Sequence, residues 1–251
     1  KPLTEFDGET LTMRLGVIGG SASTDIFMRP GVTPWPLLLA DCTGGFDEVI
    51  TRQQGMLTIA RSLPLAAELP EVDVLLLSFA TTLGWPRISP KLSNLLVPDF
   101  QAETAFHLAP YRSRTWQNRL KKRAKRLALN TVKYLAFPLG LYRPTNNLRD
   151  LEDQVRALVS IAAAKSSLVV WVQHRPIRDS RIWLERMMFD RYYKLLMQTL
   201  AKVEEPKLRV FEFPEEFMVQ ANFLLDEVHL SEEGHRRLAE HLCEQAALRG
   251  D

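Results

Sequence analysis

A serine that follows two glycines is the first candidate for chemistry. Residues 13–18 (MRLGVI) form a short, mostly apolar run, and Gly19, Gly20 and Ser21 come directly after it. Glycines allow a sharp turn, which exposes a serine at the end of a buried strand, and neighbouring backbone N–H groups can then face a developing oxyanion. The pattern alone is a weak signal for a nucleophile, because a phosphate-binding loop or a plain turn would have the same sequence.

An aspartate and a histidine three residues apart form the second candidate. Asp226 and His229 lie in a predicted loop just before the last predicted helix. Such a loop can place the carboxylate beside the Nδ1 atom of the imidazole and leave Nε2 to face a serine hydroxyl. The alternative is a packed loop histidine beside an aspartate that forms a turn.

The two segments together resemble the first and last blocks of the SGNH (GDSL-like) hydrolases. In that family the nucleophile lies in a G-D-S-x-S turn after the first strand, and a D-x-x-H pair precedes the C-terminal helix. The tail DEVHLSEEGHRRL, which begins at Asp226, is very similar to the closing block. The resemblance implies that Ser21 is the nucleophile, His229 the general base and Asp226 the partner that orients His229.

The resemblance also implies an oxyanion hole, but the sequence departs from the family there. The donors would be the Ser21 N–H, the N–H of Gly55 (Gly44 and Gly45 are alternatives) and a hydroxyl. Thr82, or Thr81, stands where the family has an asparagine. Gly20 replaces the aspartate of G-D-S. Loss of one such donor costs about 2.7–4 kcal/mol in well-studied enzymes, so we expect slow or specialised catalysis.

The expected function is that of a serine esterase or acyl-group transferase acting on a lipid or on an O-acylated carbohydrate. We expect neither a metal ion nor any other cofactor. The alternative is a non-catalytic binding or accessory module of the same fold that holds a polysaccharide or an anionic membrane surface. The missing asparagine supports that alternative, whereas the presence of Ser21, Asp226 and His229 opposes it.

The order of predicted elements defines the fold class. Apolar runs at residues 13–18, 46–51, 72–79, 167–172 and 208–213 predict strands. Helical spacing predicts helices at residues 32–40, 57–69, 148–164, 180–203 and 232–248. Because strands alternate with helices, we expect a three-layer α/β/α sandwich with a mostly parallel sheet. Sites in such sheets form at the carboxyl ends of the strands, where both candidate segments fall.

A strongly basic segment interrupts this order. Residues 104–149 hold eleven basic residues and no acidic one, and the run RLKKRAKR begins at Arg119 and ends at Arg126. We expect a single domain over residues 13–251, with residues 104–149 as an insertion or enlarged connection. Its apolar and aromatic neighbours are compatible with contact with an anionic membrane surface. A solvated lid helix and an anionic polymer are the alternatives, and nucleic acid is not expected because no recognised motif accompanies the charges.

The remaining observations concern size, cysteines and histidines. The 251 residues fit one large domain, and no apolar run of about 18 residues predicts a membrane span. Cys42 and Cys243 are expected to be buried free thiols. His174 follows a predicted strand and lies either in the pocket or in a surface loop. His235 lies past the start of the last helix, so its replacement is expected to lower activity much less than replacement of His229. In the absence of a leader pattern we expect a cytoplasmic protein, with peripheral membrane association as the alternative.

Overall fold

A single parallel sheet organises the chain. The computed structural model describes residues 13–20, 23, 31–53, 57–79, 86–88, 115–136, 138–139, 142–144, 148–174, 183–224 and 229–244. The sheet has the order β2-β1-β3-β6-β7, and every described pairing in it is parallel. Its strands are β1 (Arg14–Gly19), β2 (Glu48–Gln53), β3 (Val72–Phe79), β6 (Ser166–Gln173) and β7 (Leu208–Glu212). The expected three-layer α/β/α sandwich is therefore confirmed.

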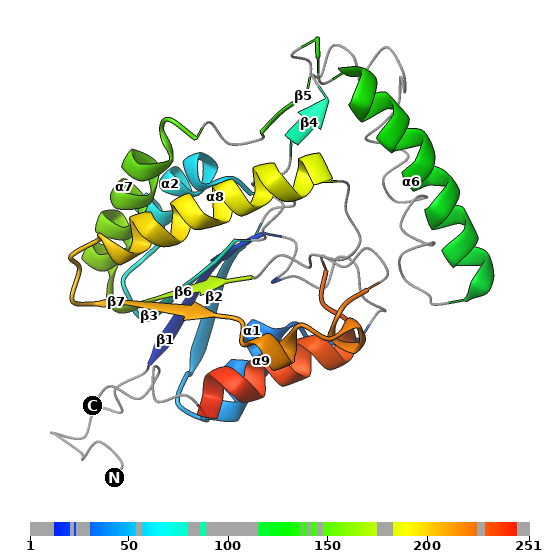
Figure 1. Ribbon diagram of the computed structural model, residues 1–251. Helices are drawn as coiled ribbons and strands as arrows, with labels where there is room; N and C mark the ends of the chain where they lie inside the picture. The colour runs from blue at the N-terminus through cyan, green and yellow to red at the C-terminus, as the bar shows by residue number, and fades with distance from the viewer. Residues whose placement is uncertain are drawn as a thin grey trace, which may run out of the picture.

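Helices cover both faces of the sheet (Figure 1). One face carries α2 (Ile59–Ala67), α7 (Leu151–Lys165) and α8 (Trp183–Ala201), and the other carries α1 (Trp35–Thr43) and α9 (Glu232–Glu244). Alternate residues of the central strands enter the two cores: Leu75 and Leu77 of β3 pack toward α7, while Val74 and Leu76 pack toward α1 and α9. Burial on both faces explains why these strands are almost continuously aliphatic.

Local signals in the sequence set the helix starts. Pro36 occupies the first turn of α1, where its missing N–H has no partner to lose. The Thr58 side chain accepts a hydrogen bond from the Arg61 N–H at the start of α2. Ser231 does the same for α9, because its Oγ accepts from the Gly234 N–H at 3.1 Å. Glu232 and Glu233 follow in the first turn of α9, where the helix dipole favours acidic residues.

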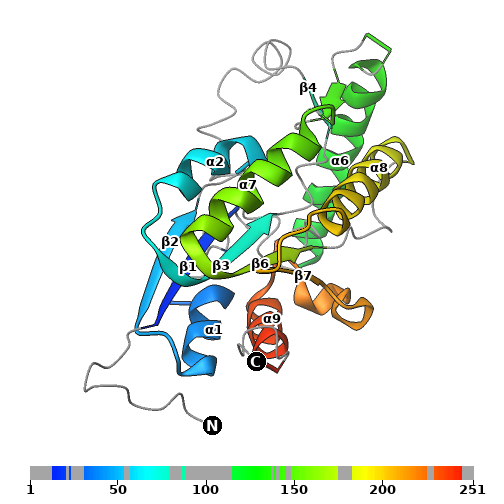
Figure 2. The same ribbon diagram turned by 90° about the vertical axis from the view of Figure 1, so that its left-hand side faces the viewer.

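The long connection between β3 and α7 contains structure of its own. A second, two-stranded antiparallel sheet pairs β4 (Pro86–Ile88) with β5 (Tyr142–Pro144). The helix α6 (Trp116–Ala136) lies between these two strands in sequence. Figure 1 shows it to the right of the main sheet, and in Figure 2 it is seen behind α8. None of the described helices combines the length and the apolar character that crossing a bilayer requires.

The expectation of free thiols is wrong, because Cys42 and Cys243 form a disulfide. The bond joins α1 to α9 across a sequence separation of 201 residues. These two helices pack side by side on one face of the sheet. Sequence spacing alone could not reveal the pair, since only the packing of the first and last helices brings the two sulfurs together. The disulfide therefore fastens the final helix to the beginning of the domain.

Removal of this disulfide is expected to destabilise the protein without changing its fold. The Cys42→Ser/Cys243→Ser variant should lose about 2–5 kcal/mol of unfolding free energy, because a long closed loop restricts the unfolded chain. Urea denaturation of the oxidised parent and the variant measures the difference. Adding dithiothreitol should weaken the parent to the level of the variant and leave the variant unchanged. Equal midpoints for the parent with and without reductant would contradict this expectation.

Candidate active site

The turn after β1 is anchored on both sides of Ser21. The Gly20 N–H donates to the Ser78 carbonyl at the end of β3 at 3.1 Å, and the Gly20 carbonyl accepts from both the N–H (3.0 Å) and the Oγ (2.8 Å) of Ser23. Gln53, the last residue of β2, donates from Nε2 to the Ser23 carbonyl at 2.7 Å. Three neighbouring strands thus fix the residues that flank Ser21.

Gly19 is required for this turn, whereas Gly20 is not crowded. A methyl group at Gly19 would overlap the buried Ser23 hydroxyl, and it would lie 3.3 Å from the Ser78 carbonyl oxygen. A methyl group at Gly20 meets no atom of the described residues within 4 Å. Room for a side chain at position 20 is consistent with the family pattern, which has an aspartate there.

A matched pair of glycine variants tests the turn. Gly19→Ala should lower the melting temperature and any activity that depends on Ser21, because Ser23 must leave its hydrogen bonds to Gly20. Gly20→Ala should fold with near-parental stability. Thermal unfolding of both variants measures the difference, and equal losses in the two variants would show that the Ser23 contact does not shape the turn.

The second candidate segment is held at both ends by backbone hydrogen bonds. The Leu224 N–H donates to the His229 carbonyl at 2.8 Å, and Phe223 and Leu230 form an antiparallel bridge. The Asn222 carbonyl accepts from the Ser231 N–H at 2.9 Å. It also abuts Gly234 so closely that a methyl group there would overlap it. Close approach of the two backbones explains the glycine three residues into α9.

Three histidines gather at the carboxyl edge of the sheet. His174 follows β6 directly and is buried, and its ring packs on Phe213 with centroids 4.1 Å apart. His235 of α9 is also buried, and its Nδ1 accepts a hydrogen bond from the Trp35 N–H at 3.1 Å. His229 is half-buried and lies near enough to act electrostatically on both. His174 is therefore not in an exposed loop, and His235 joins α9 to α1 through its hydrogen bond.

Burial keeps two of these imidazoles neutral. It lowers the pKa of His174 to about 3, with help from the nearby His235 and His229. Burial and the nearby His229 likewise lower the pKa of His235 to about 3. Neither ring can hold a proton taken from a nucleophile near neutral pH. Within this cluster His229 is the half-buried imidazole, in the position that the sequence predicts for a general base.

Of the four buried side-chain polar atoms that lack a hydrogen-bond partner among the described residues, two lie at strand ends on this edge. They are Ser78 Oγ, at the end of β3, and His174 Nε2, just past the end of β6. Orphaned polar atoms are uncommon in protein interiors and often occur where a ligand or water binds. They add support for a functional site at this edge, where the rule for parallel sheets also places one.

The other predicted site residues lie outside the described residues. These residues are Ser21, Gly55, Thr82 and Asp226, together with Thr81 as the alternative to Thr82. Strand ends nevertheless fall near them in sequence: β1 ends two residues before Ser21, and β2 ends two residues before Gly55. Gly44 ends α1 with a positive φ of 59°, and it precedes β2. Gly55 therefore follows the carboxyl end of a strand, whereas Gly44 and Gly45 do not.

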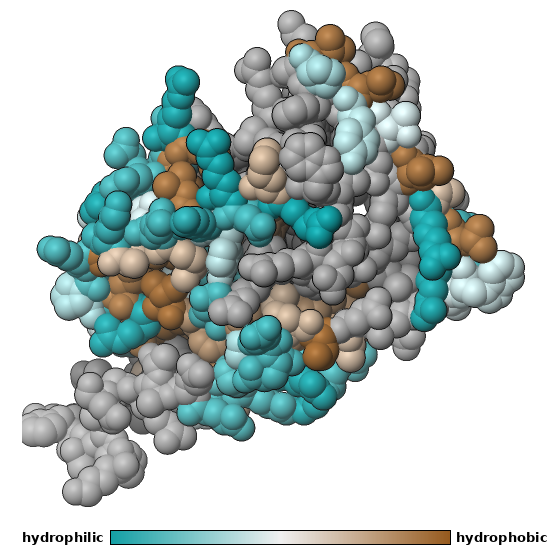
Figure 3. Space-filling view, in the orientation of Figure 1, coloured by the Kyte–Doolittle hydropathy of each residue, from teal (hydrophilic) through white to brown (hydrophobic). Residues whose placement is uncertain are grey.

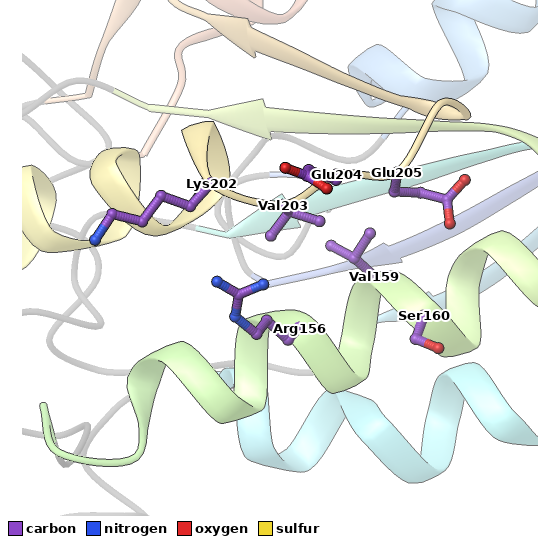
Figure 4. A pocket seen from close by; sticks show the side chains of 7 residues that line it. All are labelled: Arg156, Val159, Ser160, Lys202, Val203, Glu204 and Glu205. Carbon is purple, nitrogen blue, oxygen red and sulfur yellow. The ribbon is translucent and has the colours of Figure 1, made fainter.

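A separate hollow lies away from these residues (Figure 4). Its volume is about 460 Å³, and it lies between α7 and the segment that links α8 to β7. Arg156, which contributes to its wall, is paired with Glu152 at 3.0 Å. Residues 202–205 precede β7, so this hollow lies toward the amino end of that strand. None of the predicted site residues lines it: Arg156, Val159, Ser160, Lys202, Val203, Glu204 and Glu205 do.

The fold is shared with known ester hydrolases. TesA matches with a TM-score of 0.55 at 14% identity, over 94% of this chain and all of that one. A lipase/acylhydrolase from Enterococcus faecalis matches at 0.53 and 12% identity, over 95% of this chain and 97% of that one. An acetylxylan esterase from Geobacillus stearothermophilus, described as a catalytic histidine-to-alanine mutant, matches at 0.51 and 13% identity, over 95% and 97%.

These similarities confirm the sequence resemblance at the level of the fold: the chain has the α/β/α fold of the SGNH hydrolases. A second structure of the same acetylxylan esterase is described as a catalytic serine-to-alanine mutant, so a serine and a histidine matter in that enzyme. At the level of sequence, no protein-family model and no curated protein matches the chain.

The buried histidines predict a loss of stability in mild acid. Each has a folded pKa of about 3, below the value of 6.5 for an accessible imidazole. As the pH falls through 6.5, these two histidines take up protons in the unfolded chain but stay neutral in the folded state. The stabilisation is complete above pH 6.5 and is lost progressively toward pH 3. By pH 5 the loss should reach about 2 kcal/mol for each imidazole.

Urea denaturation between pH 7 and pH 5 measures this loss, above the range where ordinary carboxylates titrate. His235→Asn keeps an acceptor for the Trp35 N–H but removes one proton site, so its loss over this range should be about half that of the parent. A stability that stays constant from pH 7 to pH 5 in the parent would exclude buried neutral imidazoles.

Proposed function

We propose that the protein is a serine esterase of the SGNH type with Ser21 as nucleophile, His229 as general base and Asp226 as its orienting partner. The observation that carries the proposal is the position of His229 at the carboxyl edge of the sheet, beside two imidazoles that burial keeps neutral. The turn that contains Ser21 follows β1 at the same edge. Solved ester hydrolases with this fold support the reaction class.

The proposed reaction proceeds through an acyl-enzyme. Ser21 Oγ attacks the ester carbonyl while its proton passes to His229 Nε2. The tetrahedral intermediate expels the alcohol, which receives the proton from His229. Water then attacks the acyl-serine, His229 takes a proton from that water, and the acid leaves as Ser21 recovers its proton. A carbohydrate or lipid hydroxyl in place of the water would give acyl transfer by the same steps.

The proposed oxyanion hole has one unusual donor. The Ser21 N–H, the Gly55 N–H and the Thr82 hydroxyl would hold the negative oxygen of the intermediate. A hydroxyl rotates more freely than an amide, so it is less preorganised for the transition state. We therefore propose slow turnover on simple esters.

The proposed substrate is an ester of a lipid or of an O-acylated carbohydrate. Proteins of this fold include one described as a lipase/acylhydrolase and one described as an acetylxylan esterase. We further propose that the segment from Arg119 to Arg126 contacts an anionic membrane surface. Five of the seven residues from Arg119 to Lys125 are basic.

Triad variants test the proposal on a soluble ester such as p-nitrophenyl acetate. Ser21→Ala and His229→Ala should each lower kcat/KM by at least about 1,000-fold, and Asp226→Asn should follow closely. A fluorophosphonate probe should label the parent at Ser21 and leave Ser21→Ala unlabelled. His241→Ala is the matched control, because His241 packs on Phe211 of β7 and belongs to neither candidate segment; it should keep near-parental turnover.

Two outcomes would overturn the proposal. Undiminished hydrolysis by a folded His229→Ala variant would exclude the mechanism. Absence of both hydrolysis and labelling in the parent would favour the alternative from the sequence, a binding module that keeps the fold.

A further inference from the structure

The helix α6 exposes an apolar stripe along its length. Trp116, Leu120, Leu127 and Tyr134 are each between 47% and 72% exposed. They are four, seven and seven residues apart, and successive residues of a helix are rotated by about 100°. The four side chains therefore fall within about 40° of one another and form one continuous line, with Leu135 beside it. Figure 3 shows brown and pale side chains at the right-hand edge, over α6.

Basic side chains border this stripe. Arg119 and Arg123 lie on one side of it and Lys121 on the other, and all three are exposed. The whole of α6 holds seven basic residues and no acidic one. Apolar side chains between rows of cations are typical of a helix that lies in the plane of a membrane, with its apolar side among the acyl chains and its cations at the headgroups.

The charge of α6 decides between possible occupants of the stripe. A second copy of the chain would bring seven further positive charges against the first seven, which opposes self-association. A phosphate polymer would match the cations but would leave the tryptophan and leucine side chains without apolar partners. An anionic lipid surface complements both features at once. We infer that the outer face of α6 is an interfacial membrane anchor that binds anionic bilayers through the stripe and its flanking cations.

This anchor would lie near the proposed site. Figure 1 shows α6 on the side toward which the strands of the sheet point, which is the edge that carries Gly20, His174 and His229. Docking through the outer face would keep that edge close to the bilayer and so favour esters presented by a lipid surface. The choice of a lipid ester rests on the proposed catalytic triad, whereas the membrane binding of α6 does not depend on that triad.

Vesicle sedimentation of the Ser21→Ala protein tests the anchor separately from the chemistry. Vesicles of phosphatidylglycerol and phosphatidylcholine should bind the protein, binding should weaken with salt, and pure phosphatidylcholine should bind far less. Arg119→Gln/Lys121→Gln/Arg123→Gln should lower the partition coefficient by about 100-fold, since each basic residue near an anionic surface contributes about fivefold.

A second variant tests the contribution of the apolar stripe to vesicle binding. Leu120→Ala/Leu127→Ala should lower partitioning by at least about 10-fold with every charge kept, because each inserted side chain loses buried apolar groups. Alanine is the best helix former, so α6 should persist. Leu37→Ala is the matched control, an exposed leucine on α1, and it should bind like the parent.

Several results would overturn the inference. These are equal binding of neutral and anionic vesicles, unchanged binding by the stripe variant, and a dimer in sedimentation equilibrium that the stripe variant abolishes. Hydrolysis of p-nitrophenyl acetate by the same α6 variants, with Ser21 intact, should match the parent. Lost hydrolysis in a folded variant would instead place α6 in the wall of the active site.

Discussion

The backbone carbonyl of Asn222 joins the two elements that flank the loop of His229. It accepts the Ser231 N–H and touches Gly234, so it sets where the 3-10 turn η4 (Gln220–Asn222) ends and where α9 begins. The loop that carries His229 runs between these two points. A bulkier residue at Gly234 would push η4 and α9 apart, and His229 would move with the loop. The closing block of the sequence therefore fixes this loop and also carries His229, the proposed general base.

The histidine cluster determines the charge around the loop of His229. His174 and His235 contribute polar atoms to the carboxyl edge, yet they carry no charge near neutral pH because both are buried. Two protonated neighbours would oppose formation of an imidazolium at His229, which is the state a general base must pass through. Neutral neighbours remove that repulsion. His235 therefore has two roles: it is a neutral neighbour of His229, and its Nδ1 accepts a hydrogen bond from the Trp35 N–H.

Much of the fold follows from local patterns in the sequence, and the exceptions have physical causes. The strand at residues 72–79 was predicted with its observed ends, because both of its faces are buried and its residues are continuously aliphatic. The strand predicted at residues 46–51 lies at 48–53, since β2 is an edge strand with half-exposed residues and weak alternation. The antiparallel pair β4–β5 was not predicted, because three residues per strand give no periodicity.

The candidate site was likewise predicted only where local sequence patterns define it. Its turn and its loop were predicted because glycine, serine, aspartate and histidine stand at recognisable spacings. The partner of His235 could not be predicted, since Trp35 lies 200 residues away in sequence and meets it only after α1 and α9 have packed. The burial of His174 likewise depends on Phe213 from a different strand end.

The disulfide has a consequence for the order of events during biosynthesis. Because its cysteines are 201 residues apart, the Cys42 thiol must wait until the sheet and all the intervening helices have left the ribosome. Oxidation is thus a late step, which can occur only after every strand of the sheet has been synthesised. Disulfides persist in oxidising compartments and are rare in the cytosol. Protein made in a reducing host would therefore lack the bond, and α9 would be held by packing and by hydrogen bonds such as that from the Trp35 N–H to His235.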